Sequence, residues 1–192
     1  MDIGADEDSK SLQLPSGEAV RFRPLMIEDS AILGEYFVSL SATTRKVYGP
    51  HPFDQATADQ FCSELGRSRT LRMLATKQEE GQERIIGYFI VVLGVREQDR
   101  QRYDKLGISL HDETDCTIAP STADAYQNQG LGALLLAHVA DVLRRVNRKR
   151  ILLWGGTRED NPRAIHFYTK FGFRTVGEFR SDINNYDMIM DL

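Results

Sequence analysis

The chain has 192 residues, of which 41% are hydrophobic and 27% charged, and its formal net charge is -4 at pH 7. This length and apolar content suit one domain with a substantial core, which we place at residues 12–192 after a disordered acidic tail at 1–11. The acidic balance argues against a nucleic-acid partner, because such proteins normally present a basic face. Two distant cysteines, no secretory signal and no apolar run of roughly 20 residues predict a cytoplasmic protein that does not enter membranes.

Period-two alternation predicts strands, and apolar side chains that recur every three or four residues predict helices. In chain order, these patterns predict a strand at 19–23, a helix from Asp29 to Leu40, a helix around Phe61 and Leu65, a hairpin of strands 70–77 and 84–95, a strand at 113–122, a helix at 131–147, a strand at 151–154, a helix at 161–171, and strands at 173–179 and 186–191. The charged segment 96–112 is expected to be an exposed connection.

Residues that begin or end elements support this order. Asp29 and Asn161 are favourable helix caps, and the proline after Asn161 suits the first helical position. Gly172 is expected to end the last helix. Pro120 implies a bulge in the strand at 113–122, or the end of its ladder pairing. The pattern predicts an α/β (α+β) fold, with a mixed sheet covered by helices on both faces.

The most informative segment is Gln127-Asn-Gln-Gly-Leu-Gly132, here called the 127–132 turn, which stands between a strand and the strongest helix. The N–H groups at a helix start are unpaired and attract anions. Gly130 and Gly132 remove side chains that would keep a diphosphate from the backbone. A tight turn without a ligand is the alternative. Other phosphate-binding motifs fit poorly. The segment lacks the Gly-Lys-Ser/Thr of a Walker loop, and a dinucleotide-binding fingerprint would need a small residue in place of Leu135.

The segment from Ala123 to Gly132 resembles motif A of the GNAT (N-acetyltransferase) superfamily, and Asn161 to Phe173 is similar to its motif B. The element order also resembles the family fold over residues 19–192. The resemblance implies a GNAT-like mixed, mostly antiparallel sheet of six to seven strands with a splayed central strand pair. It also implies acetyl-CoA as co-substrate, no metal, and direct transfer of the acetyl group to a primary amine of a small molecule or peptide within a ternary complex.

The resemblance assigns cofactor roles by position. The splayed strand end, Pro120, Ser121 and Thr122, would pair with the pantetheine arm. The pyrophosphate would be held by the backbone amides of the turn, which belong to Asn128, Gln129, Gly130, Leu131 and Gly132. Gln127 would brace the turn, and Asn161 would reach the pantetheine amide besides capping its helix.

Tyr168 matches the family tyrosine that protonates the departing thiolate, and it lies two turns after Asn161 on the same helix. A core aromatic side chain is the alternative. The amine must first lose a proton, and the expected bases are Glu113 and Asp115, which would share one face of their strand; a solvated charged strand start is the alternative. Gly156 stands where some members carry a glutamate. Cys116 is more often a small buried residue than a nucleophile.

A non-catalytic acyl-CoA sensor is the competing hypothesis, since a sensor needs the 127–132 turn but no acid. The acceptor amine is not encoded in a readable motif, although acceptor sites in the family come from segments that match residues 29–66 and 177–186. The resemblance allows a homodimer. The four histidines show no metal-ligand spacing, and the basic run at 144–150 is expected to be a solvated helix end.

Overall fold

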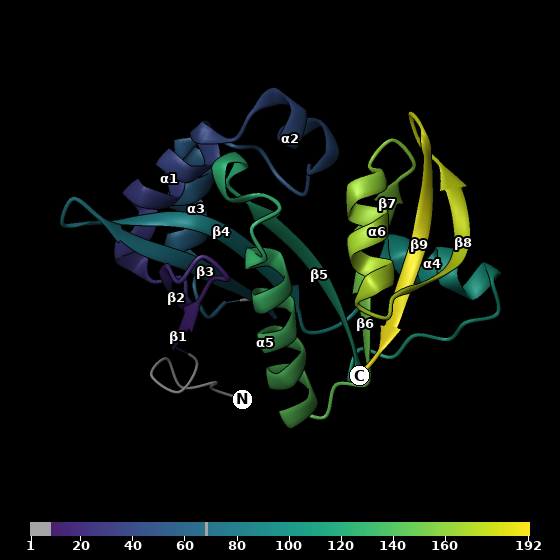
Figure 1. Ribbon diagram of the computed structural model, residues 1–192. Helices are drawn as coiled ribbons and strands as arrows, with labels where there is room; N and C mark the ends of the chain where they lie inside the picture. The colour runs from purple at the N-terminus through teal and green to yellow at the C-terminus, as the bar shows by residue number, and fades with distance from the viewer. Residues whose placement is uncertain (1–8, 68) are drawn as a thin grey trace. The chain divides into compact units, whose positions relative to one another are not determined.

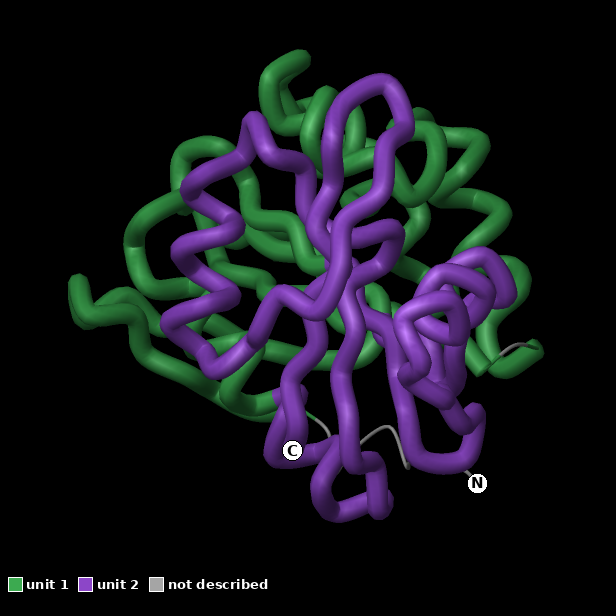
Figure 2. The backbone as a smooth tube through the Cα atoms, turned by 90° about the vertical axis from the view of Figure 1, so that its right-hand side faces the viewer, with its two compact units in different colours: residues 1–90, 120–138 green, residues 91–119, 139–192 purple. Residues whose placement is uncertain are grey.

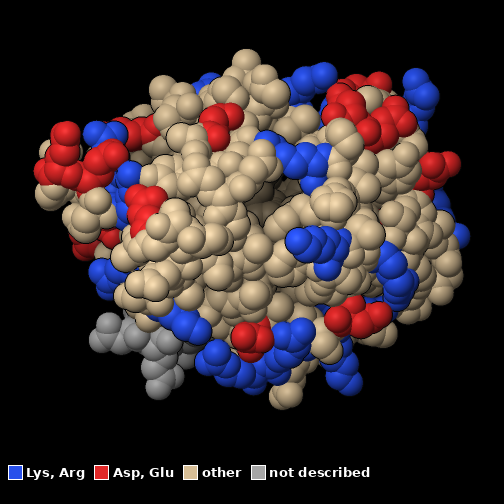
Figure 3. All heavy atoms as spheres, viewed as in Figure 1, with Lys and Arg blue, Asp and Glu red and all other residues tan. Residues whose placement is uncertain are grey.

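In the computed structural model, which describes residues 9–67 and 69–192, the chain forms two compact units. Unit 1 contains Met1–Ile90 and Pro120–His138, and unit 2 contains Val91–Ala119 and Val139–Leu192 (Figure 2). The prediction of one domain over residues 12–192 stays a prediction. On the face drawn in Figure 3, acidic and basic side chains are interspersed with uncharged ones.

The described residues form nine strands and six α-helices (Figure 1). The strands are β1 (Lys10–Gln13), β2 (Ala19–Pro24), β3 (Thr70–Glu79), β4 (Gln82–Val92), β5 (Asp115–Thr122), β6 (Arg150–Leu153), β7 (Thr157–Arg158), β8 (Arg174–Arg180) and β9 (Asn184–Asp191). The α-helices are α1 (Ser30–Ser39), α2 (Ala42–Val47), α3 (Gln55–Ser63), α4 (Glu97–Lys105), α5 (Leu131–Arg145) and α6 (Pro162–Lys170), and the short 3-10 helices are η1 (Ile27–Asp29) and η2 (Asp124–Tyr126).

The sheet of unit 1 has the order β1-β2-β3-β4. Strands β1 and β2 pair antiparallel, as do β2 and β3, with Phe22 opposite Ala75. Strands β3 and β4 form the predicted hairpin, whose two-residue turn has positive φ at Glu80 (52°) and Gly81 (80°). Two left-handed residues match the right-handed twist of the flanking strands.

Helices cover both faces of this sheet. Gly87 and Tyr88 are neighbours in β4 and therefore point to opposite faces. A Cβ at Gly87 would lie 3.2 Å from Leu135 of α5, whereas Tyr88 packs against Tyr36 and Phe37 of α1. The first turns of α5 thus lie on one face and α1 on the other (Figure 1).

In unit 2, β5 pairs parallel with β6, and β6 pairs antiparallel with β9. Strand β9 also pairs antiparallel with β7 and with β8. The core includes the buried side chains of Tyr103, Leu152 and Ile189. The Tyr103 hydroxyl donates to the Met188 carbonyl at 3.1 Å, which fixes α4 on β9.

The predicted fold class is confirmed, but the predicted strand number is wrong. The described residues form nine strands, and the two that the sequence did not predict are short and give little sequence signal: β1 lies partly in the segment expected to be a tail, and β7 has two residues. Residues 1–8 of that tail lie outside the described residues, whereas Lys10 and Ser11 belong to β1. All four residues of β1 pair with β2, and this pairing holds β1 in an extended strand.

Two helices were missed. The segment 96–112 contains α4, in which Asp99 and Tyr103 are buried, so the expected exposed connection is wrong. With only two buried positions among nine residues, α4 has no apolar stripe to detect. Helix α2 is short, with Thr44 as its buried residue.

Asp29 precedes α1 as predicted, but its side chain does not cap that helix. Its carboxylate instead accepts two hydrogen bonds from the buried Arg23 guanidinium, at 2.6 and 2.8 Å. Glu83 completes the cluster at 2.8 Å from Arg23. The buried charge of Arg23 needs these partners, and that need overrides the capping role.

Candidate functional site

The 127–132 turn lies in unit 1 and contains two residues with a left-handed backbone conformation. Helix η2 ends just before Gln127, and α5 begins at Leu131. Between them, Asn128 and Gly130 have positive φ angles of 63° and 85°. Tight turns that contain left-handed residues are among the backbone conformations in which anion-binding nests form. Asn128 tolerates this conformation better than other side chains do.

The backbone N–H groups of this turn are available. Within the described residues, none of the N–H groups of residues 128–132 donates a hydrogen bond to a protein atom. The first backbone bond of α5 runs from the Leu134 N–H to the Gly130 carbonyl at 3.1 Å. Unpaired donors at the start of a 15-residue helix combine with its dipole to favour an anion.

Gly130 is required for two reasons. Its φ of +85° is strained for any residue with a side chain, and a Cβ there would lie 3.0 Å from Cγ of Pro15. Pro15 follows β1, so the turn between β1 and β2 supports the 127–132 turn. Glycine at position 130 therefore keeps this part of the backbone free of a side chain.

Gln127 is tied to its neighbours. Its amide nitrogen donates to the Thr44 hydroxyl at 3.1 Å and to the Thr122 carbonyl at 3.4 Å. Gln129 donates to the Ala125 carbonyl at 2.5 Å. These bonds connect the 127–132 turn with the end of β5 and with α2.

Pro120, Ser121 and Thr122 form the last part of β5. The parallel ladder between β5 and β6 runs from Asp115 to Ile118 and stops before Pro120, which has no N–H to donate. The Ser121 hydroxyl is buried and lies 2.8 Å from the Tyr36 hydroxyl. Strand β5 thus loses its β6 partner just where a pantetheine arm was expected to pair.

Asn161 precedes α6 and Tyr168 lies within it, both in unit 2. Asn161 caps the helix, since its Oδ1 accepts the Ala164 N–H at 3.2 Å, and Pro162 takes the first helical position. Its amide nitrogen makes no hydrogen bond within the described residues. Capping therefore uses the oxygen and leaves a donor for a ligand carbonyl.

The Tyr168 ring packs edge-on against Phe167 and Phe173, each with a centroid distance of 5.2 Å. Its hydroxyl makes no hydrogen bond in the part of the chain that the structure describes. Burial raises the pKa of Tyr168 well above its ordinary value near 10. The residue is therefore a fixed phenol that keeps its proton at neutral pH.

The two carboxylates expected as bases have other surroundings. Asp115 is fully buried, and Arg150 binds both of its oxygens. Glu113 is exposed in a turn before β5, so the expected shared strand face is wrong. Asp115 begins β5 whereas Pro120–Thr122 end it. We therefore do not propose either carboxylate as the base.

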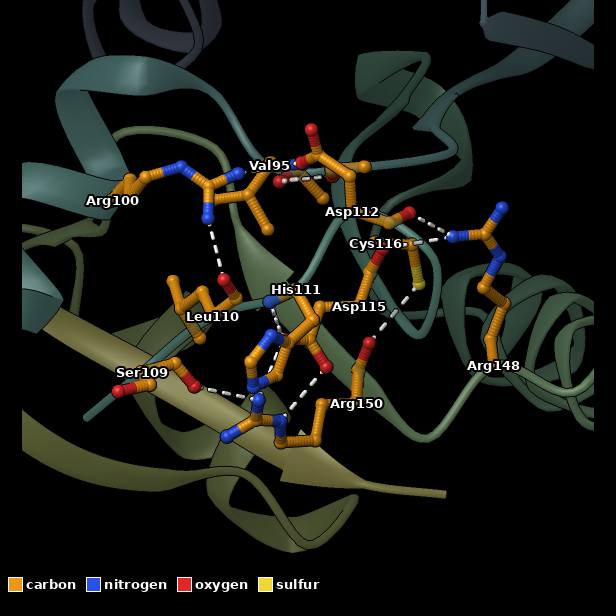
Figure 4. A network of polar contacts seen from close by, with 12 residues as sticks. Val95, Arg100, Ser109, Leu110, His111, Asp112, Asp115, Cys116, Arg148 and Arg150 are labelled. Atoms are coloured by element: carbon orange, nitrogen blue, oxygen red, sulfur yellow. Dashed lines mark hydrogen bonds and ion pairs between the residues drawn. The ribbon is translucent and has the colours of Figure 1, made fainter.

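Figure 4 shows the polar network that fixes Asp115. Arg100, Arg148 and Arg150 are directed at the segment leading into β5, where Arg148 donates to the Asp112 carbonyl at 2.5 Å and Arg100 to its carboxylate at 2.6 Å. The basic run at 144–150 is thus not only a solvated helix end, because Arg148 and Arg150 anchor this segment.

Both cysteines are free and buried. Burial raises the pKa of Cys116 to about 12, and its thiol donates to the Arg150 carbonyl at 3.2 Å, so it is poorly suited to attack a thioester.

In residues 9–67 and 69–192, no three His, Cys, Asp or Glu side chains are grouped to hold a metal ion. No helix of the described chain has the length and apolar character to cross a membrane.

The sequence interpretation missed Thr44, Ser41 and Asp124, which contact one another beside the 127–132 turn. Ser41 caps α2 by accepting the Thr44 N–H. A serine three residues before a threonine is a weak sequence signal for a six-residue helix. Asp124, which accepts a hydrogen bond from Thr44, is 80 residues away in the sequence.

Several solved structures that share this fold are named as acetyltransferases or GNAT domains. A model of the Acetyltransferase (GNAT) family matches residues 41–173. The GNAT domain of S. lividans PAT is 17% identical, with a TM-score of 0.73 over 100% of both chains. The ribosomal-protein-S5-alanine acetyltransferase from Vibrio fischeri is 13% identical, with a TM-score of 0.71 over 95% of this chain and 96% of its own.

A third structure, AAC(6')-Ib in complex with paromomycin and acetyl-CoA, is 21% identical, with a TM-score of 0.65 over 90% of this chain and 93% of its own. No curated protein matches the chain. At these identities the structural likeness shows the fold, and the family match rests on the sequence.

Proposed function

The chain belongs to the acetyltransferase (GNAT) family, and we propose that it transfers the acetyl group of acetyl-CoA to a primary amine of a small molecule or peptide. The observation that carries this proposal is the set of unpaired N–H groups at residues 128–132. Backbone donors at the start of a helix, with Gly130 leaving room, suit the diphosphate of coenzyme A.

Two further residues take roles in the proposal. The free amide nitrogen of Asn161 donates to a carbonyl of the pantetheine arm. Tyr168, which is protonated at neutral pH, donates its proton to the departing sulfur while it is hydrogen-bonded to it. The neutral amine attacks the thioester carbonyl, so a C–N bond forms while the C–S bond breaks. The proton that the nitrogen then loses passes to water, and Tyr168 regains a proton from water.

An amine acceptor is supported by the similar structures. One is crystallised with an aminoglycoside, and another is named for acetylation of a ribosomal-protein alanine. These acceptors differ in size and share an amine. The segments expected to bind the acceptor here are residues 29–66 and 177–186.

Calorimetry with coenzyme A and a free-thiol assay with acetyl-CoA test the proposal. We expect binding to the purified protein, and thiol release that depends on one member of a panel of amines, polyamines, aminoglycosides and peptides. Gly132→Leu is expected to abolish binding, because its side chain would occupy the space in front of the N–H groups. Binding that survives Gly132→Leu unchanged would place the diphosphate elsewhere. Tight binding without thiol release for any amine would favour the acyl-CoA sensor.

A further inference from the structure

The 127–132 turn is joined to helix α2 through the Thr44 side chain, which is 7% exposed. The Thr44 hydroxyl donates to the Asp124 carboxylate at 2.7 Å and accepts from the Gln127 amide at 3.1 Å. One hydroxyl thus connects the residue that begins η2 with the residue that begins the turn. All three residues lie in unit 1.

The Asp124 carboxylate is itself held by Ser41. The Ser41 N–H donates to it at 2.9 Å and the Ser41 hydroxyl at 2.7 Å, while the same hydroxyl caps α2 by accepting the Thr44 N–H at 3.2 Å. These hydrogen bonds hold the pKa of Asp124 below its ordinary value against the opposing effect of burial. The carboxylate therefore stays ionised and accepts strong hydrogen bonds.

Gln127 is the last residue before the chain reverses. It has extended backbone angles (φ -66°, ψ 145°), and the next residue, Asn128, is left-handed with φ 63°. Holding the Gln127 side chain therefore sets the direction in which the following N–H groups point. An anion site made of backbone donors depends on that direction, because each hydrogen bond weakens steeply when misaligned.

We propose that Thr44 is a positioning residue for the 127–132 turn, acting through Gln127, with Asp124 and Ser41 holding its hydroxyl in place. This inference rests on the proposed binding of coenzyme A at the turn. The same bonds also act in the other direction, so coenzyme A bound at the turn orders α2. Helix α2 lies in a segment expected to contact the acceptor.

The test compares Thr44→Val, which removes the hydroxyl at nearly constant size, with Thr44→Ser, which keeps it. Thr44→Val is expected to weaken coenzyme A binding about 5- to 30-fold, the equivalent of losing one or two hydrogen bonds, and Thr44→Ser is expected to restore affinity to within about threefold. If Thr44→Val does not fold, Asp124→Asn serves instead and is expected to weaken binding in the same range.

Thr76→Val is the matched control. The Thr76 hydroxyl is also buried and also donates to a carboxylate, that of Glu83, at 2.7 Å, but it lies in β3 away from these contacts. It is expected to lower thermal stability without changing coenzyme A affinity. Equal weakening by Thr44→Val and Thr76→Val, or an unchanged affinity in Thr44→Val, would overturn the inference.

Hydrogen exchange gives a readout that a structural role alone would not move. Coenzyme A is expected to slow exchange at residues 42–47 in the wild type by severalfold and to have no such effect in Thr44→Val. No protection of α2 in the wild type contradicts the coupling. Failure of the wild-type protein to bind coenzyme A would instead refute the proposed function, so the two failures are distinct.

Discussion

Asp115 and Arg150 form a two-point ion pair in which the arginine Nε and Nη2 lie 2.8 and 2.6 Å from separate carboxylate oxygens. The residues are opposite each other at the start of the parallel ladder between β5 and β6. Asp115 also accepts the His111 N–H at 2.7 Å. The pair thus fixes the register of two neighbouring strands, and this role uses the carboxylate that a general base would need free.

Arg150→Met is expected to lower the free energy of unfolding by about 3–5 kcal/mol, because it leaves a buried carboxylate without its cation. Urea unfolding measures the change. Arg174→Met is the control: Arg174 is 56% exposed and lies 3.3 Å from Asp191, and losing such a pair costs less than about 1 kcal/mol. If both substitutions cost the same small amount, the pair is not structural.

Tyr168→Phe is expected to reduce kcat by about 10- to 1000-fold while changing the Kd for coenzyme A less than about twofold, because only the leaving thiolate needs the phenol proton. Stopped assays of thiol release and calorimetry measure the two quantities. Tyr103→Phe removes another phenol of unit 2, one that donates to the Met188 carbonyl. That control should lose stability and keep kcat. A parallel loss of binding and kcat in Tyr168→Phe would contradict the acid role.

Gly130→Ala is expected to destabilise the protein by about 1–2 kcal/mol through its left-handed backbone, and to weaken coenzyme A binding at least about tenfold because the Cβ pushes against Pro15. Thermal melts and calorimetry check this. Gly107→Ala has a similar φ, +73°, with nothing within 4 Å of its Cβ. The control should share the loss of stability and bind normally; equal binding by both variants would refute the importance of the turn geometry.

Stability should fall on mild acidification because of His51. Its ring lies among Phe37, Phe53 and Phe61 at centroid distances of 4.8 to 5.1 Å. Burial lowers its pKa, with nearby Arg72 acting in the same direction and the Pro52 carbonyl and Asp54 opposing. The unfolded chain then binds the proton more readily, so unfolding free energy declines as pH drops from about 6.5 toward the lowered folded pKa.

Urea unfolding at pH 7.5, 6.5 and 5.5 measures this decline. In His51→Phe the imidazole contribution is absent while the carboxylates are unchanged, so its stability should depend less on pH over this range. Superimposable pH profiles for the two proteins would show that His51 does not titrate differently on folding.

Local sequence was sufficient for features that depend on neighbouring residues. Asn161 followed by proline predicted the cap of α6, and the apolar recurrence after Leu131 predicted α5, because helix caps and amphipathic faces are set within a few residues. The glycines of the 127–132 turn indicated a bare backbone for the same reason.

Tertiary structure alone decided which polar side chains are engaged. Asp29 and Asp115 could be read from sequence only as a cap and a base, but Arg23 and Arg150 reach them and bind their carboxylates. Thr44 is linked to Gln127 across 83 residues. A buried carboxylate or hydroxyl is costly unless it is hydrogen-bonded. Its partner can lie far away in the sequence, so no local sequence pattern predicts the pair.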